Sequence, residues 1–179
     1  GALISGLAAT GVLVLGSAGE PAVVASSIYV NSTNNLTLTR LTLAGGTRVG
    51  QSTLTTIVSN DIYSNGVTLA GGTGAFVSRN RIFPTTTGVV LVGNAAAPVI
   101  RANTIRGGQR GIALVGNNTS AVATSAAVIR ANRIYNSAQG ISIEAVGDGR
   151  ISDNRIRIAT IGVNSLANFA GLITSNEVA

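Results

Sequence analysis

Aliphatic residues recur along this chain in short alternating segments that keep a fixed distance from asparagine. The tripeptide Asn-x-Ile/Val recurs at intervals of 20, 23, 29, 22 and 22 residues. One aliphatic residue lies two positions after each asparagine, and another lies three positions before it. These asparagines are Asn60, Asn80, Asn103, Asn132, Asn154 and Asn176. The pattern predicts short strands of period two in a repeat of roughly 22 residues.

A glycine opens a further alternating segment in most repeats, as in Gly88-Val-Val-Leu and Gly111-Ile-Ala-Leu. Each repeat therefore contains three short strands, which is the requirement of a parallel β-helix whose coils stack their aliphatic residues in columns. We expect an all-β solenoid of about seven to eight coils in a single domain, 1–179. Residues 1–21 form an N-terminal coil or cap in this interpretation, and 22–179 carry the recognisable repeats.

The corners and the first coil follow from the same alignment. Asparagine tolerates a left-handed backbone, and its amide can bond to the next asparagine, so the six asparagines are expected to form a corner ladder. Ser26 takes the asparagine position one coil earlier, which puts Val23 and Ile28 in the inward columns. Insertions of about 10 residues at 46–55 and about 7 at 117–126 then account for the two longest intervals.

The amino-acid composition limits the kinds of catalysis and ligand binding that are open to this chain. The 179 residues include 12 arginines and 6 carboxylates but no Lys, His, Cys, Met or Trp, and the net charge is +6. Histidine catalysis, thiol chemistry, disulfides and Cys/His zinc sites are therefore excluded, and no cofactor is expected. A basic surface favours anionic partners. We expect an acidic polysaccharide as the partner, and we do not expect nucleic acid. The segment 1–16 is too short for a membrane span.

The coil pattern Asn-x-Ile followed by Gly-Ile-x-Leu resembles the right-handed parallel β-helix repeat of the pectate-lyase-like superfold, over roughly 22–179. The resemblance implies a right-handed, single-stranded helix, and it implies that any lyase or epimerase chemistry would lie on the outer face of the glycine-opened strand. The outward positions there are Thr68, Val90, Ala113, Ser142 and Asn164, with Glu144 as the one carboxylate nearby. Because a general acid and a general base are both needed, we expect no enzyme.

The strand that follows each asparagine carries more charged and aromatic side chains. The positions one and three after each asparagine point outward and bring arginines and aromatic rings together; the candidate strip is Arg81, Phe83, Arg106, Arg133, Tyr135, Arg155 and Arg157. Tyr29 and Tyr63 are expected in the same column, and Arg101 and Arg130 add charge on the preceding strand. Two interpretations remain open: a surface that binds sugars or an anionic polymer, and a self-stacking ladder that stiffens the solenoid.

We expect a non-enzymatic extracellular or cell-surface protein, namely a β-solenoid filament subunit, stalk or adhesin segment. Gly11-Val-Leu-Val-Leu-Gly16 resembles the later glycine-opened strand Gly88–Gly93, so one chain could continue the last coil of another, head to tail. The alternatives are a segment of a longer solenoid, a polysaccharide-binding module that uses the strip, and a degenerate polysaccharide lyase.

Overall fold

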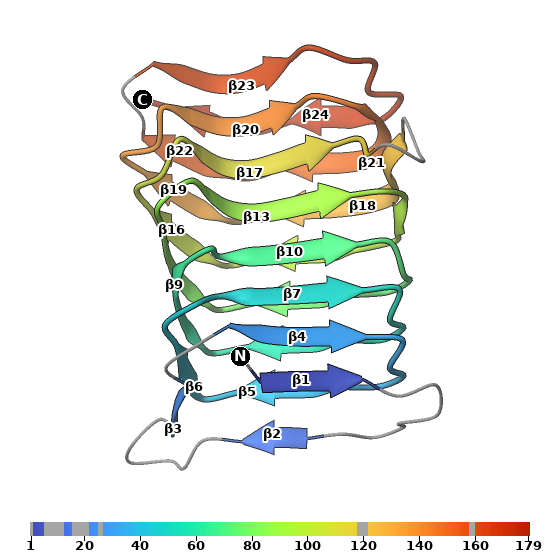
Figure 1. Cartoon of the computed structure of the whole chain (residues 1–179). Coiled ribbons are helices and arrows are strands. Elements are labelled where there is room, and N and C mark those ends of the chain that lie inside the picture. Colours follow the sequence, from blue (N-terminus) through green and yellow to red (C-terminus); the bar gives the residue numbers. More distant parts are fainter. Residues whose placement is uncertain (1, 6–12, 16–21, 25–26, 118–121, 158–159) are drawn as a thin grey trace.

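The chain forms a parallel β-solenoid, as the repeat predicts (Figure 1). The computed structural model describes residues 2–5, 13–15, 22–24, 27–117, 122–157 and 160–179. Strands at the front of Figure 1 run from left to right while the chain climbs, so the solenoid is right-handed. In the described part of the chain, no helix has the length and apolar character needed to cross a membrane.

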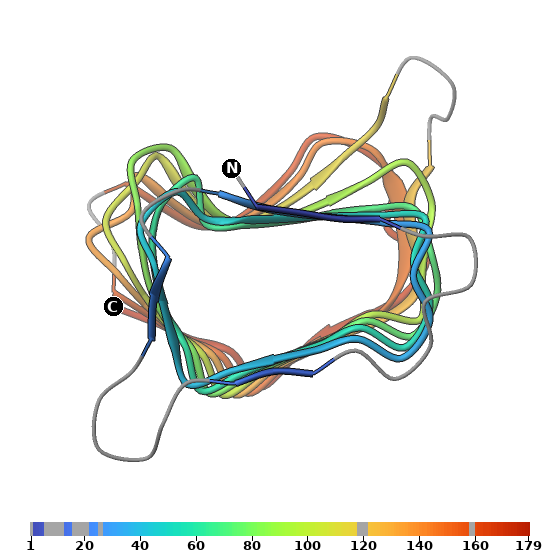
Figure 2. The ribbon, with the colours of Figure 1, turned by 60° about the horizontal axis from the view of Figure 1, so that its bottom comes forward.

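Three parallel sheets enclose the interior, and Figure 2 shows their edges around it. Sheet A contains β1 (Ala2–Ser5), β4 (Ile28–Asn31), β7 (Thr47–Gly50), β10 (Val67–Ala70), β13 (Thr87–Val92), β17 (Arg110–Val115), β20 (Gln139–Ile143) and β23 (Ile161–Ser165). Sheet B contains β2 (Leu13–Leu15), β5 (Thr37–Thr39), β8 (Thr56–Val58), β11 (Phe76–Ser78), β15 (Val99–Arg101), β18 (Val122–Arg130), β21 (Val146–Ser152) and β24 (Leu172–Thr174), with β14 (Ala95–Ala96) beside β18. Sheet C contains β3 (Ala22–Val24), β6 (Leu41–Leu43), β9 (Asp61–Ser64), β12 (Arg81–Pro84), β16 (Thr104–Arg106), β19 (Arg133–Tyr135), β22 (Arg155–Arg157) and β25 (Glu177–Val178).

Aliphatic columns fill the interior because the alternation in every strand turns one residue in two inward. One column on sheet B is in register through five coils and fully buried: Ile57, Val77, Ile100, Ile129 and Ile151. Burial of each such side chain contributes about 1.5–3 kcal/mol before conformational entropy is subtracted. The stacking of like residues therefore supplies both the stability and the register of the coils.

The asparagines occupy the corner between sheets B and C, and their side chains bond along the solenoid axis. Asn103 Nδ2 donates to Asn132 Oδ1 at 3.0 Å, and the same oxygen accepts the backbone N–H of Asn103 at 3.1 Å. The asparagine is not the left-handed residue of this corner, which corrects the expectation above. The residue before it is: Arg79, Ala102 and Ala131 have φ of 54°, 53° and 54°. The amide fills the inside of a bend that its neighbour makes.

The first coils differ from the alignment predicted around Ser26. That residue lies outside the described residues, but the position equivalent to Asn60 one coil earlier is Leu41, because Thr42 pairs with Asp61. Val23 pairs with Thr42 on the outward side of sheet C and is 71 % exposed, so its predicted inward place is wrong. Ile28 is buried as predicted, but in β4 of sheet A and not beside Ile62.

Two further expectations change with this register. The predicted insertion at 46–55 is wrong, because Thr47–Gly50 is strand β7 of a coil of ordinary length. The described residues within 11–16 form β2 (Leu13–Leu15), which pairs with β5 in sheet B, whereas Gly88–Gly93 contributes to sheet A. The two segments therefore lie in different sheets, although their sequences are similar. The second predicted insertion, 117–126, falls partly outside the described residues, and its end belongs to β18.

Candidate functional site

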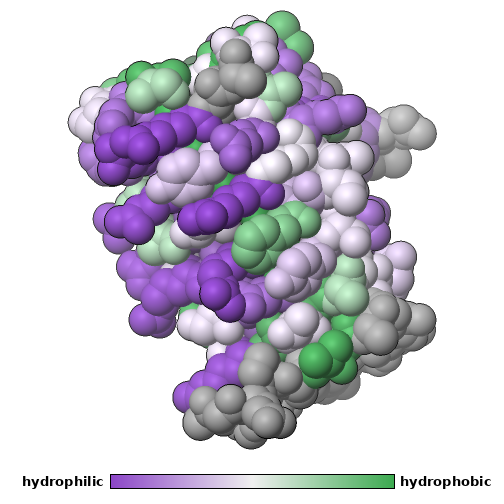
Figure 3. All heavy atoms as spheres, turned by 90° about the vertical axis from the view of Figure 1, so that its left-hand side faces the viewer, coloured by the Kyte–Doolittle hydropathy of each residue, from purple (hydrophilic) through white to green (hydrophobic). Residues whose placement is uncertain are grey.

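The structure places all seven residues of the strip on the outer face of sheet C. Arg81, Arg133 and Arg155 lie in one row along the axis, where Thr104 stands between Arg81 and Arg133. A second row runs through Arg106, Tyr135 and Arg157, with Phe83 one strand earlier on β12. Figure 3 looks at this side and shows bands of hydrophilic side chains that alternate with paler and more hydrophobic ones. Tyr29 is not among them, because β4 belongs to sheet A.

Each aromatic ring of the strip has one face packed against a side chain on an adjacent coil. Tyr63 and Phe83 stack with centroids 5.0 Å apart and an interplanar angle of 16°. The guanidinium of Arg106 lies over the ring of Tyr135 at 5.4 Å. Each such contact contributes about 0.5–1.5 kcal/mol. Since one face of each ring is occupied along the axis, the strip offers a ligand its charges more than its rings.

Two arginines of the strip are neutralised by a carboxylate on the adjacent coil. Arg81 Nε donates to Asp61 Oδ1 at 2.6 Å, and the hydrogen bond to Asp61 together with its charge raises the pKa of Arg81. Arg155 pairs with Glu177 at 3.1 Å. Arg133 and Arg157 are exposed and belong to none of the ion pairs among the described residues. Uncompensated positive charge therefore concentrates in the upper coils of sheet C.

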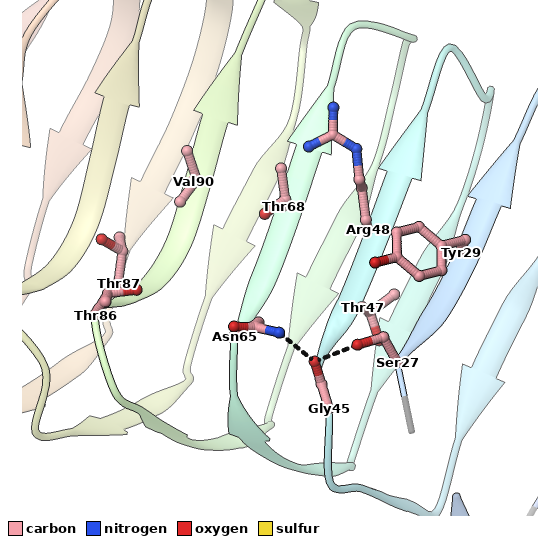
Figure 4. Close-up of a pocket in the computed structure, with 10 residues that line it drawn as sticks. All are labelled: Ser27, Tyr29, Gly45, Thr47, Arg48, Asn65, Thr68, Thr86, Thr87 and Val90. Atoms are coloured by element: carbon pink, nitrogen blue, oxygen red, sulfur yellow. Dashed lines mark hydrogen bonds between the residues drawn. The ribbon is translucent and has the colours of Figure 1, made fainter. Parts of the chain in front are cut away.

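A pocket of about 300 Å³ lies on sheet A, where the outward residues Tyr29, Arg48 and Thr68 follow one another in register (Figure 4). Ser27 Oγ and Asn65 Nδ2 both donate to the carbonyl of Gly45, at 2.7 and 3.0 Å, and hold its rim. Sequence reasoning missed Arg48, because the misplaced first coil put it inside an insertion. The Val-x-Leu alternation of Val67–Ala70, continued back to Thr47–Gly50, would have found it.

Further along sheet A, one carboxylate is held in a polar cluster. Burial raises the pKa of Glu144, but hydrogen bonds from Ser142 and Arg110 and the charge of Arg110 outweigh it, so the pKa is lowered. Ser142 is fully buried and donates to Glu144 Oε1 at 2.7 Å. The expected outward row from Thr68 to Asn164 is in register on this sheet. An anionic carboxylate paired with arginine suits a structural clamp better than proton transfer.

These observations define a class: a right-handed parallel β-helix with a basic, arginine-lined side. The family model of NosD, described as periplasmic copper-binding protein, matches residues 10–178, and the chain belongs to this family. No curated protein and no solved structure matches the chain.

The residues of this chain do not fit a copper site. Copper in proteins is held by thiolate, thioether and imidazole ligands, and the sequence contains no Cys, Met or His. Its carboxylates do not compensate, because no three of them gather at one place within the described residues. The charged groups that this chain offers a ligand are mainly the guanidinium groups of its arginines, which bind anions.

Proposed function

We propose that this chain is a non-enzymatic β-solenoid outside the cytoplasm that binds an anionic polysaccharide along sheet C. The observation that carries the proposal is the pair of exposed, unneutralised arginines Arg133 and Arg157 in register with Arg106 and Arg155. Successive strands of a sheet are about 4.8 Å apart, so these charges form two parallel rows along the solenoid axis. Such rows of charges suit a polymer, whereas a compact ligand needs a pocket.

Two further points support the placement and the class of ligand. The matching family is described as periplasmic, which agrees with a protein exposed to cell-envelope polysaccharide. Arginine forms paired hydrogen bonds with planar carboxylates and with sulfates, and every basic residue of this chain is arginine.

The experiment measures binding of alginate and heparin at several salt concentrations. Arg133→Gln should weaken binding about two- to fivefold at low salt, because one surface charge contact is worth about 0.2–1 kcal/mol. Arg48→Gln is the matched control, since it removes one exposed arginine from sheet A and changes the net charge equally. Equal losses in both variants would show that only net charge matters and would refute a site on sheet C.

A structural role by end-to-end stacking is the second candidate, and one observation favours it. Among the described strands, β1, β2 and β3 on one side and β23, β24 and β25 on the other each pair with one neighbour only, and strand pairing between two copies would continue each sheet. Ile173, which is in register with the core residue Ile151, is 43 % exposed, and Val178 is 53 % exposed. Sedimentation velocity should then show a mass that grows with concentration and falls when Ile173 is changed to Glu. A concentration-independent monomer would exclude this role.

A further inference from the structure

Three arginines line a pocket at the corner between sheets B and C, next to the strip but not part of it. Arg101 and Arg130 occupy the same outward position on β15 and β18, and Ser78 holds that position on β11. Arg79 follows Ser78 as the left-handed residue of its corner. These four residues, with Ala102 and Ala131, line a pocket of about 210 Å³. Both alanines are small, so they leave room for the pocket beside the three arginines.

The positive charge of this pocket is not neutralised by the described residues around it. No carboxylate lines the pocket. The described ion pairs involve Arg81, Arg110 and Arg155, and so none of the three arginines at the pocket. Guanidinium groups on adjacent strands repel one another in the absence of an anion, so an anion between them would lower the energy of the arrangement.

A buried hydroxyl inside the pocket points to a ligand independently of charge. Ser78 is 0 % exposed, and its Oγ has no hydrogen-bond partner. Its neighbour Val77 faces the core, so alternation turns the Ser78 side chain outward, toward the pocket that it lines. A buried hydroxyl without a partner is unfavourable, and an anionic oxygen would accept its hydrogen.

The orientation of Arg101 is also fixed in advance. Its guanidinium carbon lies 4.9 Å from the centroid of the Phe76 ring, in a cation–π contact on the same sheet. The ring therefore limits where this guanidinium can lie, while an N–H edge of the planar group can still donate hydrogen bonds. Such an edge donates two parallel hydrogen bonds to two oxygens of one phosphate or sulfate group.

We propose that this corner pocket binds a tetrahedral oxyanion, a sulfate ester or a phosphate monoester, through Arg79, Arg101, Arg130 and the Ser78 hydroxyl. The site is separate from the rows of sheet C and does not depend on the proposed function. It would take a single charged group, whereas the strip would take a chain of them.

The test is a titration of the ¹⁵N-labelled chain followed at the arginine Nε–Hε signals. Sodium sulfate, sodium phosphate, glucose 6-sulfate and glucose 6-phosphate are added at constant ionic strength, with sodium chloride as the reference. We expect the Arg101 and Arg130 signals to shift saturably with one shared Kd, and chloride to shift neither. Tighter binding of an ester identifies a sugar-borne group, and tighter binding of an inorganic anion identifies the free ion.

Variants separate this site from general attraction. Arg101→Gln or Arg130→Gln should weaken the oxyanion at least tenfold, while Arg133→Gln, which removes the same charge just across the corner, should leave Kd within twofold. Ser78→Ala keeps every charge and should still weaken binding. Arg130 is exposed, so Arg130→Gln keeps the test valid if Arg101→Gln fails to fold. Equal effects of Arg130→Gln and Arg133→Gln, or the absence of a saturable shift, would overturn the proposal.

Discussion

Replacing Asn132 by leucine removes four side-chain hydrogen bonds from the interior corner of the solenoid. Asn132 is 0 % exposed. Its Oδ1 accepts from the backbone N–H and the Nδ2 of Asn103, and its Nδ2 donates to the Ile100 carbonyl and to Asn154 Oδ1, all at 2.9–3.1 Å. Leucine fits such a corner, because Leu41 occupies the equivalent position beside Asn60 and is 2 % exposed. Steric conflict therefore does not explain the expected loss.

The magnitude follows from what each freed group can reach. The Asn103 Nδ2 keeps its bond to the Val77 carbonyl at 3.0 Å, whereas the Asn103 backbone N–H loses Oδ1 and is buried away from water. An orphaned buried group costs about 1–3 kcal/mol, and each other lost bond costs about 0.5–1.5 kcal/mol. Burial of the leucine side chain offsets part of this loss. We expect Asn132→Leu to lower the free energy of unfolding by about 2–4 kcal/mol.

The matched control is Asn176→Leu. Asn176 makes the same kinds of bond to Asn154 and to the Ile151 carbonyl, but it is only partly buried, so water replaces the lost partners. Its cost should be about 1 kcal/mol or less. Urea unfolding followed by far-ultraviolet circular dichroism measures both variants. If the two lose equal stability, burial of the ladder is not what makes it stabilising, and the reasoning fails.

Three other substitutions and one metal-binding measurement have outcomes that follow from the structure and the composition. Ile134→Asp should prevent folding, because it buries an unpaired carboxylate in the core; a variant with wild-type thermal stability would refute the inward column. Gly111→Ala should lose about 1–3 kcal/mol in urea unfolding, since its Cβ would lie 2.5 Å from Ile134 Cγ2, and an unchanged midpoint would contradict this packing. The pKa of Glu144 is lowered from its usual 4.5, so the stability that its ionised form contributes is present above pH 4.5 and is lost as the pH falls through the lowered pKa. Glu144→Gln should therefore reduce the loss of unfolding free energy at acid pH. If the wild type and the variant lose stability in parallel as the pH falls, Glu144 does not stabilise the fold through its charge. Equilibrium dialysis of the 179-residue chain against Cu(II) should retain no stoichiometric copper, and one tightly held ion per chain would contradict the ligand argument.

The sequence predicts the solenoid from Asn60 onward because corner and core residues repeat there at every coil. It misplaces the first coils, where Leu41 replaces asparagine and the interval falls to 19 residues, so the marker disappears while the fold continues. The corner keeps its bend at Leu41 because the preceding residue makes it: Arg40 has a φ of 55°. The alternation of the sequence shows which face of a strand each residue lies on. It does not show whether a leucine or an asparagine fills a given corner.

The sequence also predicts part of the candidate site, namely the positions of its arginines but not their contacts. Alternation places Arg81, Arg133 and Arg155 on one outer face, and the register follows from the asparagine spacing. The same spacing places Asp61 beside Arg81, and Thr104 and Arg155 beside Arg133. It does not show whether Arg81 and Asp61 form an ion pair, because that depends on side-chain rotamers. Nor does it reveal the unpartnered Ser78 hydroxyl, which requires the burial of that atom to be known.

Arginine footprinting tests the central claim most directly. The chain is treated with phenylglyoxal in the presence and absence of size-defined alginate oligosaccharides, and modification of each arginine is read by mass spectrometry. Binding along sheet C predicts protection of Arg106, Arg133 and Arg157 by at least about threefold, which corresponds to occupancy of most chains, while Arg48 on sheet A stays reactive. Equal protection of Arg48, or none at Arg133, would contradict a polysaccharide-binding face on sheet C.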